Sequence, residues 1–273
     1  MLYLSRTILL LVFLMVSSAL CVLAQGAKKD TVCTNHLVMP NADLDNYELP
    51  LTGKLKRVET QEIDLVDNLN ADLIATTDFD ELGRVSNTFL SNSKIKVFGK
   101  EIYRYDAQNR LVLINSYNPD GAAVMEDVFT YDSTGSLKQK VSRNAKTKVV
   151  IWNKEFSYPA GNEYSELFDK RHGFGFRYKK DNRCRIVEVT SFDLGRTVTS
   201  KFLVSYDDEK NTMEESIYSP DGNLLDKKKA EFELDANGNW VKKTRYDLAI
   251  ENGKPVFKPT IIVHRKITYY DSK

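Results

Sequence analysis

From Leu51 onward, short runs of alternating apolar and polar residues are separated by Gly, Asn, Asp and Pro. Before the breaks, apolar side chains recur at every second position, as in Tyr103 and Tyr105 or Phe129 and Tyr131. A period of two places such side chains on one face of a β-strand. Asp can cap a tight turn with its carboxylate, and Gly or Asn accepts the positive φ that the turn needs. The pattern therefore predicts β-hairpins.

The hairpin pattern repeats along the chain. Its units begin at Phe79, Tyr105, Tyr131, Tyr158, Tyr178, Tyr206 and Leu234, and these starts are 26, 26, 27, 20, 28 and 28 residues apart. An apolar residue after each turn should open the return strand, and in the fifth unit we expect it to be Cys184. Six or seven hairpins correspond to roughly 12 to 14 strands.

Regularly spaced turn signals favour an antiparallel meander. We predict a mainly β fold in which the repeated hairpins of residues 51–273 form one domain, either a long curved sheet or an open barrel-like wrap. An open sheet has edges that must be covered or paired. A homodimer that pairs edge strands is therefore a further expectation.

The first 24 residues have the pattern of a secretory signal peptide. A short basic start containing Arg6 precedes an apolar run, and Ala24 ends a small-residue motif that favours cleavage before Gln25. Two alternatives are a retained membrane anchor, for which the run is short, and a lipoprotein anchor at Cys21. Residues 25–50 should form an extended N-terminal segment. We expect an exported protein, periplasmic or extracellular, with no membrane span after cleavage.

Charge gives no reason to expect a nucleic-acid partner. The chain has 39 basic and 38 acidic residues, and loss of Arg6 with the signal balances them. A balanced chain has no net field that would draw it to nucleic acid or an anionic membrane.

Two cysteines, Cys33 and Cys184, would remain after export. An exported compartment permits a disulfide between them, which would attach the N-terminal segment to the sheet. The alternative is that Cys184 is a buried free thiol that packs as a small apolar side chain.

The repeat resembles the YD repeat of bacterial RHS-type proteins and of smaller exported proteins. Residues 131–137 (YDSTGSL) match its Tyr-Asp-x-x-Gly-x-Leu pattern at every marked position, and residues 105–111 match with Asn in place of Gly. Other units depart further, because Pro159 follows Tyr158 and Leu234 replaces the aromatic residue. The resemblance covers roughly residues 51 to 270 and implies hairpin architecture but no catalytic residues.

Residue types that could support catalysis or metal binding have simpler explanations. The repeated aspartates, one per hairpin, are expected to cap turns rather than to bind calcium, which needs converging oxygens. The cluster of Glu163, Glu166 and Asp169 leaves a carboxylate-based hydrolase open, since such carboxylates need only spatial proximity. The three histidines lack metal-ligand spacing. We expect no metal and no cofactor.

The region after Pro159 interrupts the repeat, and glycines alternate there with aromatic residues. Glycine in a strand indicates a bend, a bulge or the close approach of another backbone or a ligand. We therefore predict that any ligand or partner surface contains Arg171, His172, Phe174 and Phe176.

These observations predict a non-catalytic envelope or secreted protein that presents a β-repeat surface to a protein partner. A carbohydrate-binding envelope protein is the first alternative, because exposed aromatic rings can stack on sugars. A carboxylate-based hydrolase is the second.

Overall fold

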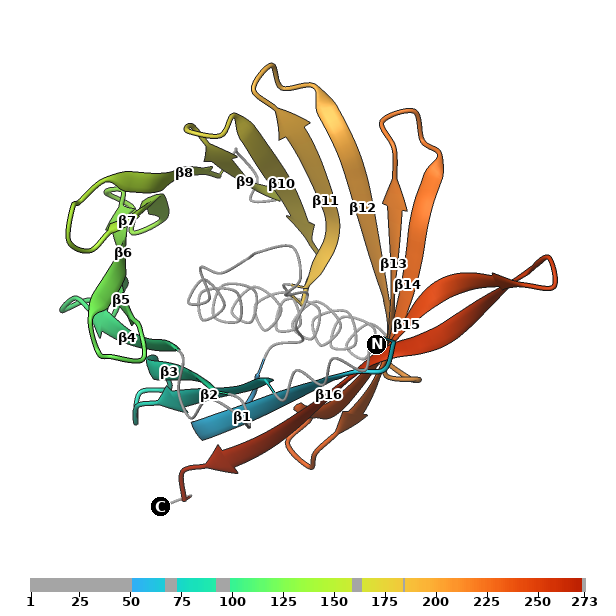
Figure 1. Cartoon of the computed structure of the whole chain (residues 1–273), viewed down its shortest axis with the longest axis horizontal. Coiled ribbons are helices and arrows are strands. Elements are labelled where there is room, and N and C mark those ends of the chain that lie inside the picture. The colour runs from blue at the N-terminus through green and yellow to red at the C-terminus, as the bar shows by residue number, and fades with distance from the viewer. Residues whose placement is uncertain (1–50, 67–72, 92–98, 159–163, 184, 272–273) are drawn as a thin grey trace, which may run out of the picture.

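A computed structural model describes residues 51–66, 73–91, 99–158, 164–183 and 185–271 (Figure 1). The predictions for the signal peptide, the N-terminal segment and the Cys33–Cys184 pair lie outside these residues. The described residues form strands β1 (Leu55–Asp64), β2 (Leu73–Phe79), β3 (Val85–Ser91), β4 (Gly99–Tyr105), β5 (Leu111–Tyr117), β6 (Ala123–Tyr131), β7 (Leu137–Asn144), β8 (Val150–Ser157), β9 (Tyr164–Asp169), β10 (Phe174–Lys180), β11 (Ile186–Asp193), β12 (Val198–Asp207), β13 (Thr212–Tyr218), β14 (Leu224–Leu234), β15 (Trp240–Glu251) and β16 (Lys254–Tyr269). Within these residues no helix is long and apolar enough to cross a membrane.

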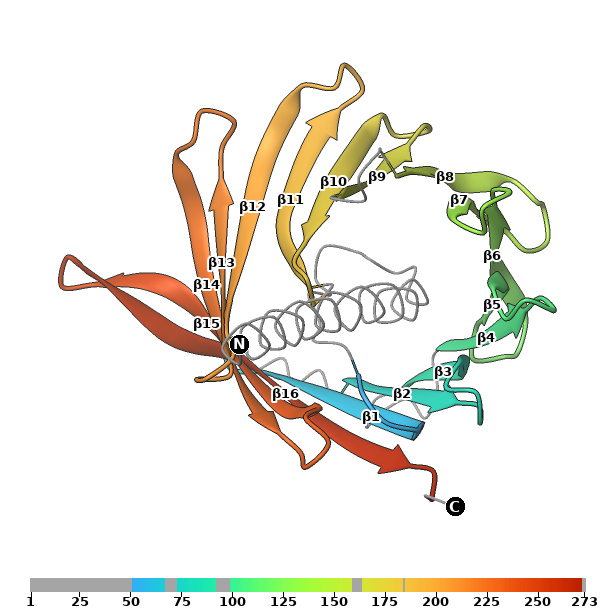
Figure 2. The same ribbon diagram turned by 180° about the vertical axis from the view of Figure 1, so that it is seen from behind.

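The strands form an antiparallel meander that closes on itself as a barrel (Figures 1 and 2). The mainly β meander is confirmed, but the expected open sheet or wrap is replaced by a closed ring. Closure arises because β1 pairs with β16 as well as with β2. The seven predicted hairpins account for β2 to β15, and the ring is completed by one further strand at each end. The edge-strand dimer was predicted because an open sheet has unpaired edges. In this barrel the first and last strands pair with each other, so that reason no longer applies.

A latch of side chains joins the two ends of the described chain. The Thr52 backbone N–H donates to Asn239 Oδ1 (2.6 Å), and Asn239 Nδ2 donates to the Thr52 carbonyl (2.8 Å). The Tyr269 hydroxyl donates to Asp235, and the Tyr270 hydroxyl donates to the Phe79 carbonyl. These bonds tie the last strand to the first hairpin and to the last repeat turn, so closure is specified by side chains as well as by the ladder.

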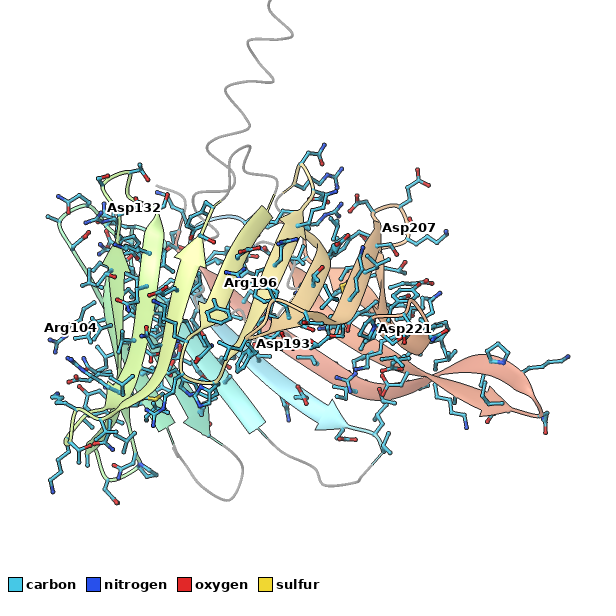
Figure 3. The ribbon with its side chains drawn as sticks, turned by 90° about the horizontal axis from the view of Figure 1, so that it is seen from above. Arg104, Asp132, Asp193, Arg196, Asp207 and Asp221 are labelled. Carbon is cyan, nitrogen blue, oxygen red and sulfur yellow. The ribbon has the colours of Figure 1, made fainter. Side chains whose placement is uncertain are left out.

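The meander places the repeat turns among the described residues at one end of the barrel, together with the start of β1 and the end of β16. We call this end the Asp-turn rim. Its capping carboxylates are Asp80, Asp106, Asp132, Asp181, Asp207 and Asp235. Figure 3 shows Asp132 and Asp207 at this rim. The turns between β5 and β6, β9 and β10, and β13 and β14 lie at the other end, the opposite rim.

The capping geometry is illustrated by the second unit. Asp106 Oδ1 accepts the N–H groups of Gln108 and Arg110 at 2.9 Å each. Asn109 has a φ of 62°, the left-handed conformation that Asn tolerates. The turn-capping interpretation of the repeated aspartates is therefore confirmed.

A tyrosine and an arginine join one repeat hairpin to the next at three places in the barrel. The Tyr105 hydroxyl donates to the Val85 carbonyl at 2.8 Å. The Arg84 guanidinium lies 4.6 Å from the centre of the Tyr105 ring, and Arg84 Nε donates to Asp80 Oδ2. The same arrangement recurs for Arg110 with Tyr131 and for Arg185 with Tyr206. The repeat spacing thus sets the contact between successive hairpins.

The fifth unit is two residues out of step with the predicted alignment. Lys180, not Tyr178, pairs with the first residue of the return strand, which is Ile186. Asp181 caps this turn. Our assignment of Cys184 to the opening of the return strand is therefore wrong, because the turn begins at Asp181 and β11 begins at Ile186. The predicted spacing of 20 residues between Tyr158 and Tyr178 is short in part because the fifth unit was aligned two residues too early.

The two faces of the wall differ in character. Figure 3 shows Arg104 projecting away from the barrel, so Tyr103 and Tyr105, which alternate with it on β4, face inward. The outer face carries ion pairs along the ladder, such as Arg57 with Asp78 and Arg143 with Glu126. Further pairs on this face join Glu188 to Lys201, Glu214 to Lys227 and Glu233 to Lys242. The outer face is therefore charged.

The buried apolar residues form three clusters on the inner face. One surrounds Phe79 and Val85, a second contains Ile114 and Phe129, and the largest includes Trp240. Trp240 is 1% exposed, and the Arg265 guanidinium lies 3.5 Å from its ring centre. The repeat aromatic residues therefore supply much of the core, as the period of two predicts.

Candidate functional site

A line of aromatic rings runs along the inner wall from the turn between β9 and β10. Trp152 and His172 have ring centres 3.9 Å apart, and Phe174 is 6.3 Å from each of them. Phe176 lies 5.6 Å from Phe174, and Tyr178 follows at 6.2 Å. We call these five residues the inner aromatic strip. Successive inward positions of one strand, β10, supply three of the rings, so the strand itself fixes their spacing.

The turn that presents His172 is organised by Asp169. This carboxylate is buried, and its Oδ1 accepts the N–H groups of Arg171 and His172 at 2.9 Å each. Oδ1 also lies 3.1 Å from His172 Nδ1. Asp169 therefore fixes both the backbone of the turn and the orientation of the imidazole against Trp152.

Three of the four predicted surface residues, His172, Phe174 and Phe176, are brought together on the inner wall. Arg171 is exposed in the turn, and its backbone, not its side chain, contributes through Asp169. Sequence reasoning missed Trp152. The alternation of Trp152 with Phe156 along β8 was the available signal, since it places both rings on one face.

The strip is distinct from the packed core. Trp152, His172 and Phe174 belong to none of the three core clusters of the described residues, whereas Phe176 packs against the largest one. The His172 side chain is 37% exposed. The strip therefore passes from a buried end at Tyr178 to an accessible end at His172.

Gly175 allows close packing on the other side of the same strand. A Cβ added there would lie 2.4 Å from Phe192 Cε2 and 2.8 Å from the Leu167 carbonyl oxygen. Phe192 stacks with Phe168 on the outer face, with ring centres 6.1 Å apart. The alternating glycine therefore accommodates an aromatic ring from the protein itself.

An ion-pair cluster covers these outer rings. The Arg196 guanidinium lies 4.8 Å from the Phe192 ring centre, and Arg196 and Arg177 both donate to Glu166 (Figure 3). Burial alone would raise the pKa of Glu166, but hydrogen bonds from Arg196 and Arg177 outweigh it and lower the pKa. Glu166 lies on the outer face and Asp169 on the inner face, because they are three residues apart on one strand. They do not converge as a hydrolase pair.

The inner wall also holds charge. Lys140 Nζ lies 2.8 Å from Asp127 Oδ2, and both side chains are buried. Farther round the ring, the ladder pairs Glu215 with Lys228, and Lys228 with Asp247, on the same face as the core. The interior therefore presents aromatic side chains over β8 to β10 and opposite charges over β13 to β15.

Fold and interior together define a closed β-barrel with an aromatic and charged inner wall. No family model matches the sequence, and a search of curated proteins finds no match. Solved structures with similar folds include porin-like proteins from Bacteroides uniformis ATCC 8492 (10% identity, TM-score 0.41) and Bacteroides vulgatus ATCC 8482 (12% identity, TM-score 0.44). Each match covers 80% of this chain and 99% of the other.

A TcdB2–TccC3–Cdc42 complex matches 70% of this chain and 10% of its own, at 13% identity and a TM-score of 0.18. Similarities this distant concern the fold alone. Membership of the YD-repeat family therefore stays a prediction, and the functional argument rests on the residues of the barrel wall.

Proposed function

We propose that this protein is a non-catalytic, exported barrel that binds a polypeptide partner at its inner aromatic strip. The observation that carries the proposal is the cluster of Trp152, His172 and Phe174, whose rings face the interior without joining a core cluster. Tryptophan is among the residue types that contribute most of the binding energy at protein interfaces.

The interior favours a polypeptide over a small apolar molecule. A closed ring of 16 strands is wider than its own side chains can fill. A guest in contact with both walls would meet aromatic rings on one side and the charges of Glu215 and Lys228 on the other. A polypeptide segment with one apolar and one charged face has matching chemistry.

The outer face supports a barrel that stands in water. A bilayer-spanning barrel presents an apolar band to lipid, and a basic side chain there costs about 2–4 kcal/mol at the membrane midplane. Here ion pairs such as Arg143 with Glu126 lie on the outer face of adjacent strands. We therefore assign the protein to an aqueous exported compartment, and we expect it to remain monodisperse without detergent.

Photo-crosslinking from the strip tests the proposal. A benzophenone amino acid replaces Phe174 in the exported chain, and the control carries it at Phe89, a half-buried aromatic residue on the outer face. We expect the same polypeptide adduct in repeated envelope extracts from position 174 and not from position 89. Equal adducts from both positions, or none from position 174, would contradict the proposal.

A carbohydrate guest is a second candidate, favoured by the position of Trp152 beside Lys154 and the buried Asp169. Aromatic faces stack on sugar rings, and charged side chains bind hydroxyl groups. Because the chain has two tryptophans, Trp240→Phe leaves Trp152 as the sole indole reporter. A saturable change in its emission with an oligosaccharide, absent with a peptide that has one apolar and one charged face, would favour this candidate.

A further inference from the structure

The chain enters the described structure on the inner face of the barrel. Leu51, the first described residue, packs against the inner-face cluster around Phe79 and Val85. The next residue, Thr52, is held at the Asp-turn rim by its hydrogen bonds with the buried Asn239. The N-terminal segment that precedes Leu51 is therefore joined to the wall at a fixed point on the inner face of this rim.

This segment is long enough to reach the opposite wall. Figures 1 and 2 show β1 and β10 on opposite sides of the ring. Met39 precedes Leu51 by 12 residues, which an extended chain spans over about 40 Å. The whole of β10, from Phe174 to Lys180, is about 20 Å long. The segment thus has length to cross the ring and to run along β10 inside it.

The end of β10 nearest the Asp-turn rim carries a lysine in place of a repeat aromatic residue. Lys180 is opposite the first residue of the return strand, the place that Tyr105 and Tyr131 hold in their hairpins. It therefore faces inward, as these tyrosines do. Burial lowers the pKa of Lys180 although water reaches its side chain, as expected on a concave wall. Among the described residues no carboxylate pairs with it, so it offers an unpaired charge to the interior.

The sequence of the N-terminal segment matches this wall in order. Residues 41–50 contain three acidic residues and no basic one. Farther from Leu51 comes an unbroken apolar run, residues 37–39 (LVM). A chain that crosses from Leu51 to β10 meets Lys180 before the inner aromatic strip. The acidic residues therefore reach the lysine where the apolar run reaches the rings.

We propose that residues 37–48 dock on the inner wall over β10, with residues 37–39 on the inner aromatic strip and the acidic residues at Lys180. The segment is then the chain's own occupant of the strip, and a partner must displace it. Because it is tethered, its effective concentration is on the order of mM, so a weak contact suffices. The inference rests on the proposed use of the strip as a polypeptide-binding surface, but it requires no second protein.

Photo-crosslinking within the purified chain tests the docking. The benzophenone amino acid at position 174 of the exported chain, with no extract added, should form an intrachain adduct that mass spectrometry maps to residues 37–48. Position 89 should not. Val38→Asp should lower the yield from position 174 by about fivefold or more, since it puts a carboxylate against the rings. The matched control, Val32→Asp, makes the same change outside residues 37–48 and should leave the yield unchanged.

A second pair of variants tests the charge contact. Lys180→Glu should lower the yield of the intrachain adduct by about threefold, because it replaces an attraction to the acidic residues with a repulsion. Lys179→Glu is the matched control, since Lys179 precedes Lys180 on β10 and lies on the outer face. We expect this control to leave the yield unchanged.

Several results would overturn the proposal. These are no intrachain adduct from position 174, an adduct that maps outside residues 37–48, or equal effects within either pair of variants. An adduct between two copies, with a yield that rises with protein concentration, would also overturn it. A partner adduct from envelope extract without the intrachain adduct would contradict the docking alone. The intrachain adduct without any partner adduct would support the docking and contradict the proposed function.

Discussion

Along the Asp-turn rim, Asp80, Asp106 and Asp235 cap turns of one length with the same pair of backbone hydrogen bonds. The opposite rim is mixed, because the turns that open at Asn118, Asp193 and Ser219 repeat the backbone hydrogen bonds of the Asp turns, whereas its other turns differ. Asp169 organises a short turn around His172, Asn144 caps another, and β15 and β16 extend into an arm. The Asp-turn rim carries the links between hairpins and the closure latch, whereas the accessible end of the inner aromatic strip lies toward the opposite rim.

This difference suggests a division of labour. Turns that are copies of one another satisfy a shared requirement, the spacing of successive hairpins. Turns that differ are free to present different side chains from the same scaffold. Substitutions at the Asp-turn rim should therefore lower stability, and substitutions at the opposite rim should lower binding.

The largest expected effect separates two aromatic residues of the inner face. Trp240→Ala should lower the free energy of unfolding by about 3–5 kcal/mol, because it removes a fully buried ring from the core. Phe174→Ala removes a half-buried ring outside the core clusters and should cost about 1 kcal/mol. Urea denaturation of both variants measures the difference. Similar losses in the free energy of unfolding would show that the inner aromatic strip is as much a part of the core as Trp240.

Gly175→Ala should follow in size, at about 1–3 kcal/mol, since the added Cβ meets Phe192 and the Leu167 carbonyl. Gly99→Ala is the matched control, because a Cβ at this strand position finds its nearest neighbour, a Leu90 carbon, at 3.7 Å. We expect the control to change stability by less than about 1 kcal/mol. A tolerated Gly175→Ala would show that the outer rings can move aside.

A smaller loss is expected from Tyr105→Phe. The change removes the hydroxyl that donates to the Val85 carbonyl, which should cost about 1 kcal/mol. Tyr117→Phe, at the opposite end of β5's ladder with β4, serves as control. Urea midpoints compare the two, and an equal effect would argue against a special contribution of the repeat tyrosines.

The smallest expected effect is on the pH dependence of stability, and Tyr105→Phe also tests it. Burial, with a contribution from Asp80, raises the pKa of Tyr105 from its ordinary 10.0 to about 12. A phenol whose pKa is higher in the folded state contributes stability that is complete below pH 10 and lost as the pH rises toward 12. Tyr105→Phe should make the alkaline decline in stability shallower. An unchanged slope would contradict this assignment.

The hairpins could be predicted because their cause is local. Each Asp turn and the alternation before it lie within a few residues, and the repeat sets the contact of Tyr105 with the preceding hairpin. Closure could not be predicted in this way. The latch joins Thr52 to Asn239, 187 residues apart, and follows no repeat.

The candidate site divides along the same line. His172, Phe174 and Phe176 were predicted because glycine interrupts an aromatic strand, although Gly175 proves to accommodate Phe192. The contact of Trp152 with His172 depends on the register between β8 and β9, which cannot be deduced from the sequence. Alternation assigns a side chain to a face, but register decides which side chains meet.

The pairing of β1 with β16 has a consequence for how the barrel assembles. Each hairpin can form as soon as its two strands exist, whereas the pairing of Leu55 with Tyr269 must wait until nearly the whole described chain is available. Contacts this distant in sequence are slow to form. Until they do, both ends of the growing sheet are open to pairing with other chains. We expect ring closure to be the late, rate-limiting step, and the stage at which this protein is most prone to aggregate.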